Sequence, residues 1–153
     1  MKTAQPLQKI LIISLSGIGD AVMFSPALHL LRQTYPDAAI DLLCMFKGVE
    51  DIFKRNEDIN AIFRWDFLKA SPFASLKFVL SLRGQYDASI STYPANRWEY
   101  NMINAFVGAP KRLAHDYNHC NISSLSLLNT HRVQEDDKLH NVEENVRLVE
   151  LLG

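Results

Sequence analysis

The sequence lacks the features that mark several large classes of protein. Its only two cysteines, Cys44 and Cys120, cannot form a disulfide framework, so free thiols in a cytosolic protein are expected. No apolar run approaches the roughly 18 residues of a membrane-spanning helix. No apolar stretch precedes Lys9, so no signal peptide is predicted. The chain also lacks an excess of positive charge. Its net charge is −1, so its overall charge does not indicate binding to nucleic acid.

What is present is typical of a folded globular domain. The chain has 153 residues, of which 48% are hydrophobic and 22% are charged, and these values exclude a disordered chain. The length suits one domain, covering residues 1–153, that buries a core without disulfide or metal support.

Short apolar runs alternate with segments of helical periodicity. Strands are predicted at 9–15, 39–44, 60–65, 86–92 and 112–115, and helices at 48–55, 72–82, 99–107 and 140–152. The segment between Asp20 and Tyr35 is also helical. Either one helix bends at Pro26, or Ser25 caps a helix that begins at Pro26. Residues 116–139 are predicted to be an irregular loop.

This alternation predicts an α/β fold, a three-layer α/β/α Rossmann-like parallel sheet. Ligands of such sheets bind beyond the carboxyl ends of the strands. We therefore expect functional residues directly after each strand.

The loop at residues 16–20 is the strongest local signal. Gly17 and Gly19 allow a sharp turn and a close approach to a ligand. The dinucleotide fingerprint needs a third glycine where Val22 stands, and no phosphate-binding loop follows. Asp20 suits either an ionised base or a cap at the start of the next helix.

Several motifs resemble the heptosyltransferases of glycosyltransferase family 9. Residues 9–28 contain a strand, the loop S-x-x-G-D, an apolar helix start and Pro-Ala-Leu, in the order found in that family. The similarity continues at residues 35–43, 86–90 and 108–113, and residues 140–148 resemble the family's H-x-v-x-x-N-x-x-l helix. The resemblance therefore extends over nearly the whole chain.

The resemblance implies the N-terminal, acceptor-side half of a GT-B enzyme. In that arrangement two Rossmann-like domains face a cleft, and the C-terminal domain binds the nucleotide sugar. A donor-binding domain is thus expected on the same or another chain, and the present domain alone is expected to be inactive. The family's catalytic base maps onto Asp20, while Ser16, Gly17 and Gly19 would shape the acceptor loop.

Further acceptor-binding residues are predicted after the second and fourth strands. Lys47 follows the second strand, and Asn96 and Arg97 follow the fourth. Cationic side chains suit the phosphate and carboxylate groups of lipopolysaccharide core, the acceptor that the resemblance implies. The family's Gln-Gly after the fourth strand is replaced here by residues 92–96, a departure that affects the expected acceptor.

No metal site and no bound cofactor are predicted for this chain. His115, His119 and Cys120 could ligate a metal in principle, but no second cysteine pair supports such a site. His140, at the start of the last helix, is predicted to be half-buried and bonded to a backbone carbonyl. The large aromatic side chains are expected in the core or at a domain interface: Trp65, Phe73, Phe78, Trp98 and Phe106.

The sequence thus predicts part of an inverting glycosyltransferase. The resemblance implies heptose transfer from an ADP-heptose-type donor to a lipopolysaccharide or related surface glycan. It also implies a cytoplasmic protein, with peripheral association at the inner membrane face left open, and no nucleic-acid partner. Two alternatives remain: an NAD- or nucleotide-binding domain of an oxidoreductase, and a non-catalytic module that binds a glycan or a protein.

Overall fold

The computed structural model describes residues 6–119 and 123–153. The strands are β1 (Lys9–Ser14), β2 (Ala39–Cys44), β3 (Ala61–Arg64), β4 (Ala88–Ser91), β5 (Lys111–Asp116) and β6 (His131–Gln134). The α-helices are α1 (Ile18–Met23), α2 (Ser25–Thr34), α3 (Lys47–Phe53), α4 (Pro72–Ser81), α5 (Trp98–Val107) and α6 (Asn141–Val149). Two short 3₁₀ helices span Ser126–Leu128 and Glu150–Leu152.

The six strands form one sheet in the order β3-β2-β1-β4-β5-β6. All neighbouring strands are parallel, as the alternation of strands and helices requires. The chain leaves β1 toward β2 and β3 and then returns to build the other half of the sheet from β4. The carboxyl ends of β1 and β4 therefore flank the point where the strand order reverses.

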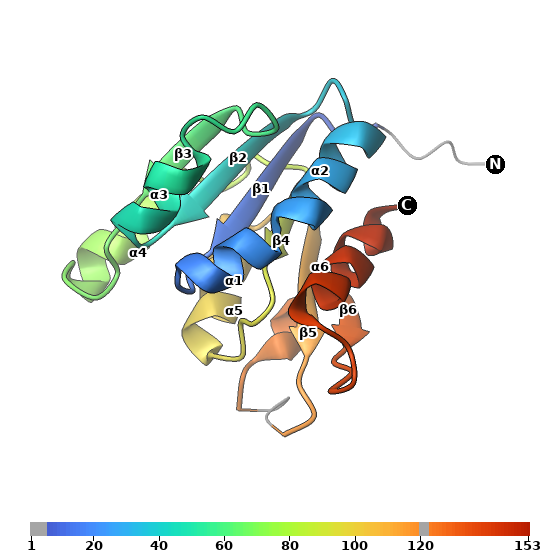
Figure 1. Cartoon of the computed structure of the whole chain (residues 1–153). Helices are drawn as coiled ribbons and strands as arrows, with labels where there is room; N and C mark the ends of the chain where they lie inside the picture. Colours follow the sequence, from blue (N-terminus) through green and yellow to red (C-terminus); the bar gives the residue numbers. More distant parts are fainter. Residues whose placement is uncertain (1–5, 120–122) are drawn as a thin grey trace.

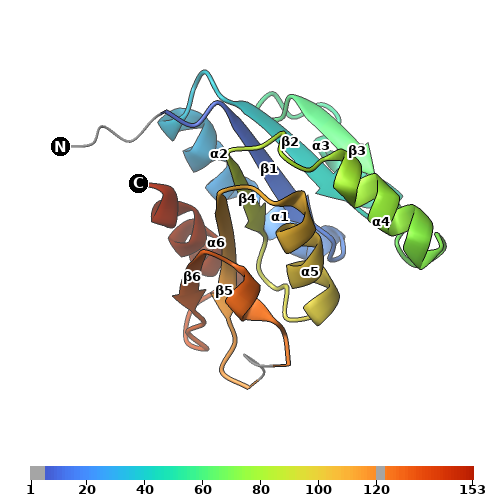
Figure 2. The ribbon, with the colours of Figure 1, turned by 180° about the vertical axis from the view of Figure 1, so that it is seen from behind.

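Helices cover both faces of the sheet, which confirms the predicted α/β/α layers (Figures 1 and 2). The alternation of side chains along β1 supplies both cores: Ile10 and Ile12 face α1, α2, α3 and α6, whereas Leu11 and Ile13 face α4 and α5. A strand buried on both faces needs a continuous apolar run, and the run in β1 made that strand predictable.

The segment around Pro26 differs from both expected arrangements. Instead of one bent helix or a helix capped by Ser25, the chain forms two helices that meet at Phe24. Phe24 ends α1 and precedes α2, so Pro26 lies in the first turn of α2, where its missing N–H costs no hydrogen bond. The buried Phe24 side chain fixes this junction in the core.

The prediction that residues 116–139 form an irregular loop was wrong for part of this range, of which residues 120–122 lie outside the described residues. The range contains the short 3₁₀ helix Ser126–Leu128 and the strand β6, which pairs with β5 at the edge of the sheet. Only half-buried side chains alternate with exposed ones along β6, so no apolar run marks it. An ion pair from Arg132 of β6 to Asp116 of β5, at 3.0 Å, reinforces the pairing.

Candidate functional site

The loops that follow β1 and β4 meet at the carboxyl edge of the sheet. The Ser16 hydroxyl donates a hydrogen bond to the Pro94 carbonyl over 3.0 Å, and the Thr92 amide donates to the Ile13 carbonyl over 3.1 Å. The two loops that sequence analysis singled out therefore form one continuous surface, as expected for parallel strands.

Helix α6 holds the loop after β4 in place. The buried Asn145 side chain accepts a hydrogen bond from the Tyr93 amide at 2.8 Å and donates to the Tyr93 carbonyl at 3.3 Å. The Tyr93 hydroxyl donates to Glu135, and the Ala95 amide donates to the Tyr117 hydroxyl. Asn145 is the asparagine of the 140–148 motif, so the role of that motif residue is to position the loop after β4. The motif alone did not predict this role.

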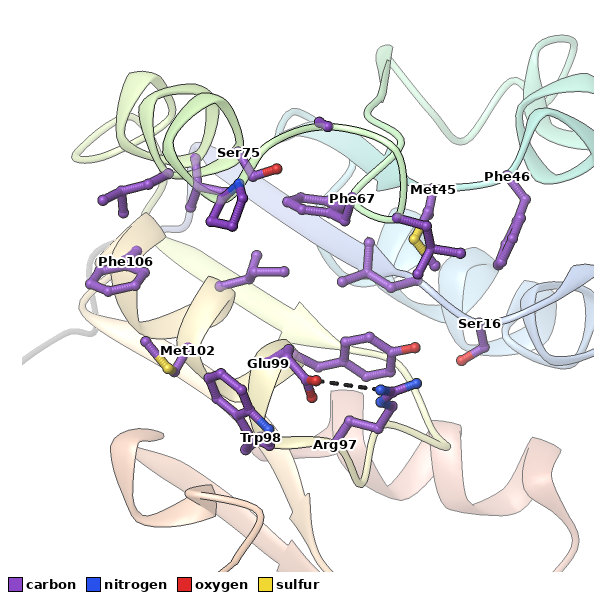
Figure 3. A pocket seen from close by; sticks show the side chains of 18 of the residues that line it. Ser16, Met45, Phe46, Phe67, Ser75, Arg97, Trp98, Glu99, Met102 and Phe106 are labelled. Atoms are coloured by element: carbon purple, nitrogen blue, oxygen red, sulfur yellow. Dashed lines mark hydrogen bonds and ion pairs between the residues drawn. The ribbon is translucent and has the colours of Figure 1, made fainter.

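A pocket of about 570 Å³ opens beside these loops (Figure 3). Its floor includes Leu15 and Met45, at the ends of the first two strands, and its two long walls are the facing sides of α4 and α5. Ser16, Gly17 and Arg97 line it, so three of the predicted site residues come together there. This volume lies in the range of ligand pockets.

Charged and polar groups gather where α5 begins. An Arg97 guanidinium nitrogen lies 3.3 Å from one Glu99 carboxylate oxygen, while the other Glu99 oxygen is buried without a hydrogen-bond partner. Burial raises the pKa of the nearby Tyr100 phenol; the charge of Arg97 opposes this rise, and the carboxylates of Glu99 and Asp20 add to it.

Glu99 and Tyr100 were missed by the sequence analysis. It considered only residues up to Arg97 after the fourth strand, and the first turn of the next helix completes the site. Extending the search by one helical turn beyond each strand would have included both residues.

Asp20 lies in the first turn of α1, and it does not cap that helix. Gly17 holds the cap position with extended backbone angles, and no side chain there accepts a capping hydrogen bond. The half-buried Asp20 carboxylate is at the third position of α1, in the first turn of that helix. Neither Gly17 nor Gly19 has a positive φ, so the turn itself does not need glycine; a Cβ at either residue would point into open space.

Three predicted acceptor residues, Gly19, Lys47 and Asn96, are not among the residues that line the pocket. Lys47 is exposed at the start of α3, where its ammonium group pairs with Asp51 at 3.3 Å. Asn96 is exposed in the loop before α5.

The histidines have structural surroundings. His115 is fully buried, and its Nε2 lies 3.0 Å from a Glu144 carboxylate oxygen. Within residues 6–119 and 123–153, no cluster of three or more candidate ligands could hold a metal ion, while Cys120 lies outside the described residues. The prediction for His140 was wrong: this residue is exposed and caps α6, its Nδ1 accepting a hydrogen bond from the Val142 amide.

Burial of His115 predicts a loss of stability in mild acid. Burial lowers the pKa of His115 below its usual value of about 6.5, against the opposing charge of Glu144. Below pH 6.5 the unfolded chain gains a proton that the folded protein does not. The free energy of unfolding should therefore fall with decreasing pH, by at most about 1.4 kcal/mol per pH unit from this group. Urea unfolding between pH 7.5 and 5 measures the slope.

A pair of variants isolates the contribution of His115. His115→Gln should flatten the slope below pH 6.5, whereas His29→Gln should retain it, because the His29 side chain is 62% exposed. Equal slopes in wild type and His115→Gln would contradict the assignment.

The aromatic residues divide between core and surface. Trp65 stacks on Phe78 at 4.5 Å and donates a hydrogen bond to Ser75, and Phe106 is half-buried, as expected for core or interface positions. Phe73 and Trp98 are instead 78% and 49% exposed. In the part of the chain that the structure describes, no helix has both the length and the apolar character needed to cross a bilayer.

The chain is similar to known heptosyltransferases. It is 29% identical over 140 residues to lipopolysaccharide heptosyltransferase 3 of Escherichia coli K12, covering 88% of this chain and 40% of that protein. The structure of E. coli ADP-heptose lipopolysaccharide heptosyltransferase II matches with a TM-score of 0.72 and 25% identity, over 93% of this chain and 40% of that one. The structure of a family 9 glycosyltransferase from Veillonella parvula matches with a TM-score of 0.73 and 19% identity. The match covers 95% of this chain and 41% of that one. No protein-family model matches the chain.

These comparisons confirm the fold class and the resemblance predicted from the motifs. The fold is the parallel α/β fold of GT-B heptosyltransferase structures. Within that class, the chain resembles the lipopolysaccharide heptosyltransferases in sequence and in fold. It spans about 40% of the length of the heptosyltransferase 3 that it matches.

Proposed function

We propose that this chain is the N-terminal, acceptor-side domain of an inverting heptosyltransferase. The complete protein would transfer heptose from an ADP-heptose-type donor to a hydroxyl of lipopolysaccharide or a related surface glycan. A donor-binding domain, on the same or a partner chain, would hold the nucleotide sugar. The proposal includes a cytoplasmic site of action, with peripheral contact at the inner membrane face.

The observation that carries the proposal is the position of Asp20. Asp20 lies in the first turn of α1, directly after β1 and three residues beyond Gly17, which lines the pocket. Inverting transfer needs a base close to the attacking acceptor hydroxyl, within hydrogen-bond distance or one water away. In the proposed reaction the acceptor hydroxyl oxygen attacks the anomeric carbon of the donor, and Asp20 takes the hydroxyl proton. The bond between the anomeric carbon and the diphosphate breaks, and ADP leaves.

The other predicted residues divide into two groups. Ser16 and Gly17 line the pocket beside Arg97, which is placed to meet a phosphate or carboxylate of the acceptor. Gly19, Lys47 and Asn96 lie outside the pocket and would contact only parts of an acceptor that extend beyond it.

The test is heptose transfer by the complete protein. Incubation with ADP-heptose and a lipopolysaccharide core acceptor should release ADP and add one heptose, with inversion at the anomeric carbon. Mass spectrometry detects the added sugar, and nuclear magnetic resonance assigns its configuration. Release of ADP without glycan extension would contradict the proposed acceptor class, and retention of configuration would contradict the direct displacement.

The strand order is also that of dinucleotide-binding domains, which makes NAD the competing ligand. Against NAD, Val22 replaces the third glycine, and the end of β2 carries Cys44 and Met45, both buried and apolar, in place of an acidic residue for ribose. Calorimetric titration of this chain with NAD, ADP and an ADP-sugar separates the candidates. Saturable micromolar binding of NAD would favour the oxidoreductase.

A further inference from the structure

The pocket has a long apolar part that the proposed transfer chemistry does not explain. Helices α4 and α5 turn apolar faces toward each other across it, with Leu76 and Val79 on one wall and Met102 and Phe106 on the other. Leu76 remains 38% exposed, so the pocket leaves apolar surface in contact with water. Covering that surface with a hydrocarbon would be favourable, at about 25 cal/mol per Å².

The charged lining is confined to one region. Of the described residues that line the pocket, only Arg97 and Glu99 are charged, and they form a pair at the start of α5. Figure 3 shows this pair between Ser16 on one side of the pocket and Phe106 on the other. Arg97 and Glu99 therefore lie toward the loop after β1, where Met45 and Phe46 also line the pocket, whereas the part between the two helices is lined mainly by apolar side chains.

This distribution of polarity fits an amphiphile. A sugar buried in the apolar part would leave hydroxyl groups without partners, and each unpaired group costs free energy. A protein segment would have the same difficulty with its backbone amides, because helix side chains, and no free strand edge, form the walls. A hydrocarbon chain requires no polar partner, and a polar head would meet Arg97 and Ser16.

We propose that the α4–α5 pocket binds the hydrocarbon chain of an amphiphilic acceptor and so orients its polar head toward Asp20. The proposal rests on the proposed function for the identity of the head as an acceptor. The hydrocarbon site itself depends only on the geometry of α4 and α5. The occupant is thus an acyl or alkyl chain attached to a sugar-bearing head.

Alkyl maltosides of increasing chain length, kept below their micelle concentration, test the hydrocarbon site. Affinity for this chain should rise about fourfold for each added methylene, as expected when each one leaves water. Maltose alone should not bind. With ¹³C-methyl methionine, the signals of Met45 and Met102, which line the pocket, should shift on binding, whereas that of Met23 in α1 should not.

Two leucines of α4 provide a matched pair of variants. Leu76→Glu places a charge in the pocket and should abolish the dependence on chain length. Leu80→Glu makes the same change on the same helix, at a residue 42% exposed and outside the pocket lining, and should bind like wild type. Equal loss in both variants, or equal shifts at Met23 and Met102, would show non-specific adsorption and overturn the proposal.

Two more outcomes distinguish a hydrocarbon site from a protein-binding surface and from the proposed transfer activity. Methyl shifts at Met45 and Met102 that depend on protein concentration without any ligand would show that another protein surface covers the pocket, and would overturn the lipid assignment. Transfer by the complete protein to a chain-free core oligosaccharide tests the proposed function independently. If that transfer occurs but alkyl chains do not bind, the hydrocarbon site alone is wrong.

Discussion

Replacing Asp20 by asparagine should lower the turnover of heptose transfer by about 10²- to 10⁴-fold, the usual contribution of a general base. Asparagine keeps the size of the side chain but cannot accept the proton of the acceptor hydroxyl. Because Asp20 is half-buried in the first turn of α1 and makes no capping hydrogen bond, the fold should remain intact. Steady-state kinetics on the complete protein should show the loss in kcat, with little change in KM for the donor.

Asp37→Asn is the matched control for this prediction. Asp37 is exposed in the turn before β2, at the amino edge of the sheet and away from the pocket, so its variant should transfer heptose at the wild-type rate. If Asp20→Asn kept near-normal turnover, Asp20 could not be the base. The next carboxylate to replace would be Glu99, which lines the pocket and has one buried oxygen without a hydrogen-bond partner.

The sheet was predictable because its central strands are buried on both faces. The apolar runs at residues 9–15 and 39–44 match β1 and β2 within one residue. Strand β6 was missed because it lies at the edge of the sheet, and its polar residues contain no such run. Its position depends on tertiary pairing with β5, which no local pattern encodes.

The site was predictable to the extent that topology defines it. The rule for parallel sheets placed Ser16, Gly17 and Arg97 near one another, and the structure brings them to one pocket. It could not foresee that α4 and α5 leave a cavity between them, because the spacing of two helices depends on how their side chains pack. Nor could it separate Lys47, which extends to solvent, from the residues that line the pocket.

The contacts that hold the site in place are also tertiary, and no local sequence pattern encodes them. The loop after β4 depends on contacts with distant segments, through Asn145 of α6, through Tyr117, which follows β5, and through Glu135, which follows β6. Behind it, the ring of Tyr93 lies edge-on to His115 at 4.8 Å. The loop that leads to Arg97 therefore rests, through Tyr93, on His115 of β5 and Asn145 of α6.

Replacing Glu144 by leucine should therefore destabilise both the fold and the site. The Glu144 side chain is 1% exposed and accepts hydrogen bonds from the Asp136 amide at 2.6 Å and from Arg147 at 2.9 Å, besides its contact with His115. Removing the carboxylate leaves the buried His115 ring and the Asp136 amide without this partner, and each buried polar group left unsatisfied costs about 1–3 kcal/mol. Urea unfolding at pH 7.5 measures the change.

Two further variants identify the source of that loss. Glu144→Gln retains the shape and one acceptor oxygen, so it should lose less than Glu144→Leu. Glu150→Leu removes an exposed carboxylate beyond the end of the same helix and should change the free energy of unfolding by less than about 0.5 kcal/mol. A Glu144→Leu variant as stable as Glu150→Leu would show that the buried pair does not stabilise the fold. If Glu144→Gln instead matched wild type in stability, the hydrogen bond from Asp136, and not the charge, would be what Glu144 contributes to stability.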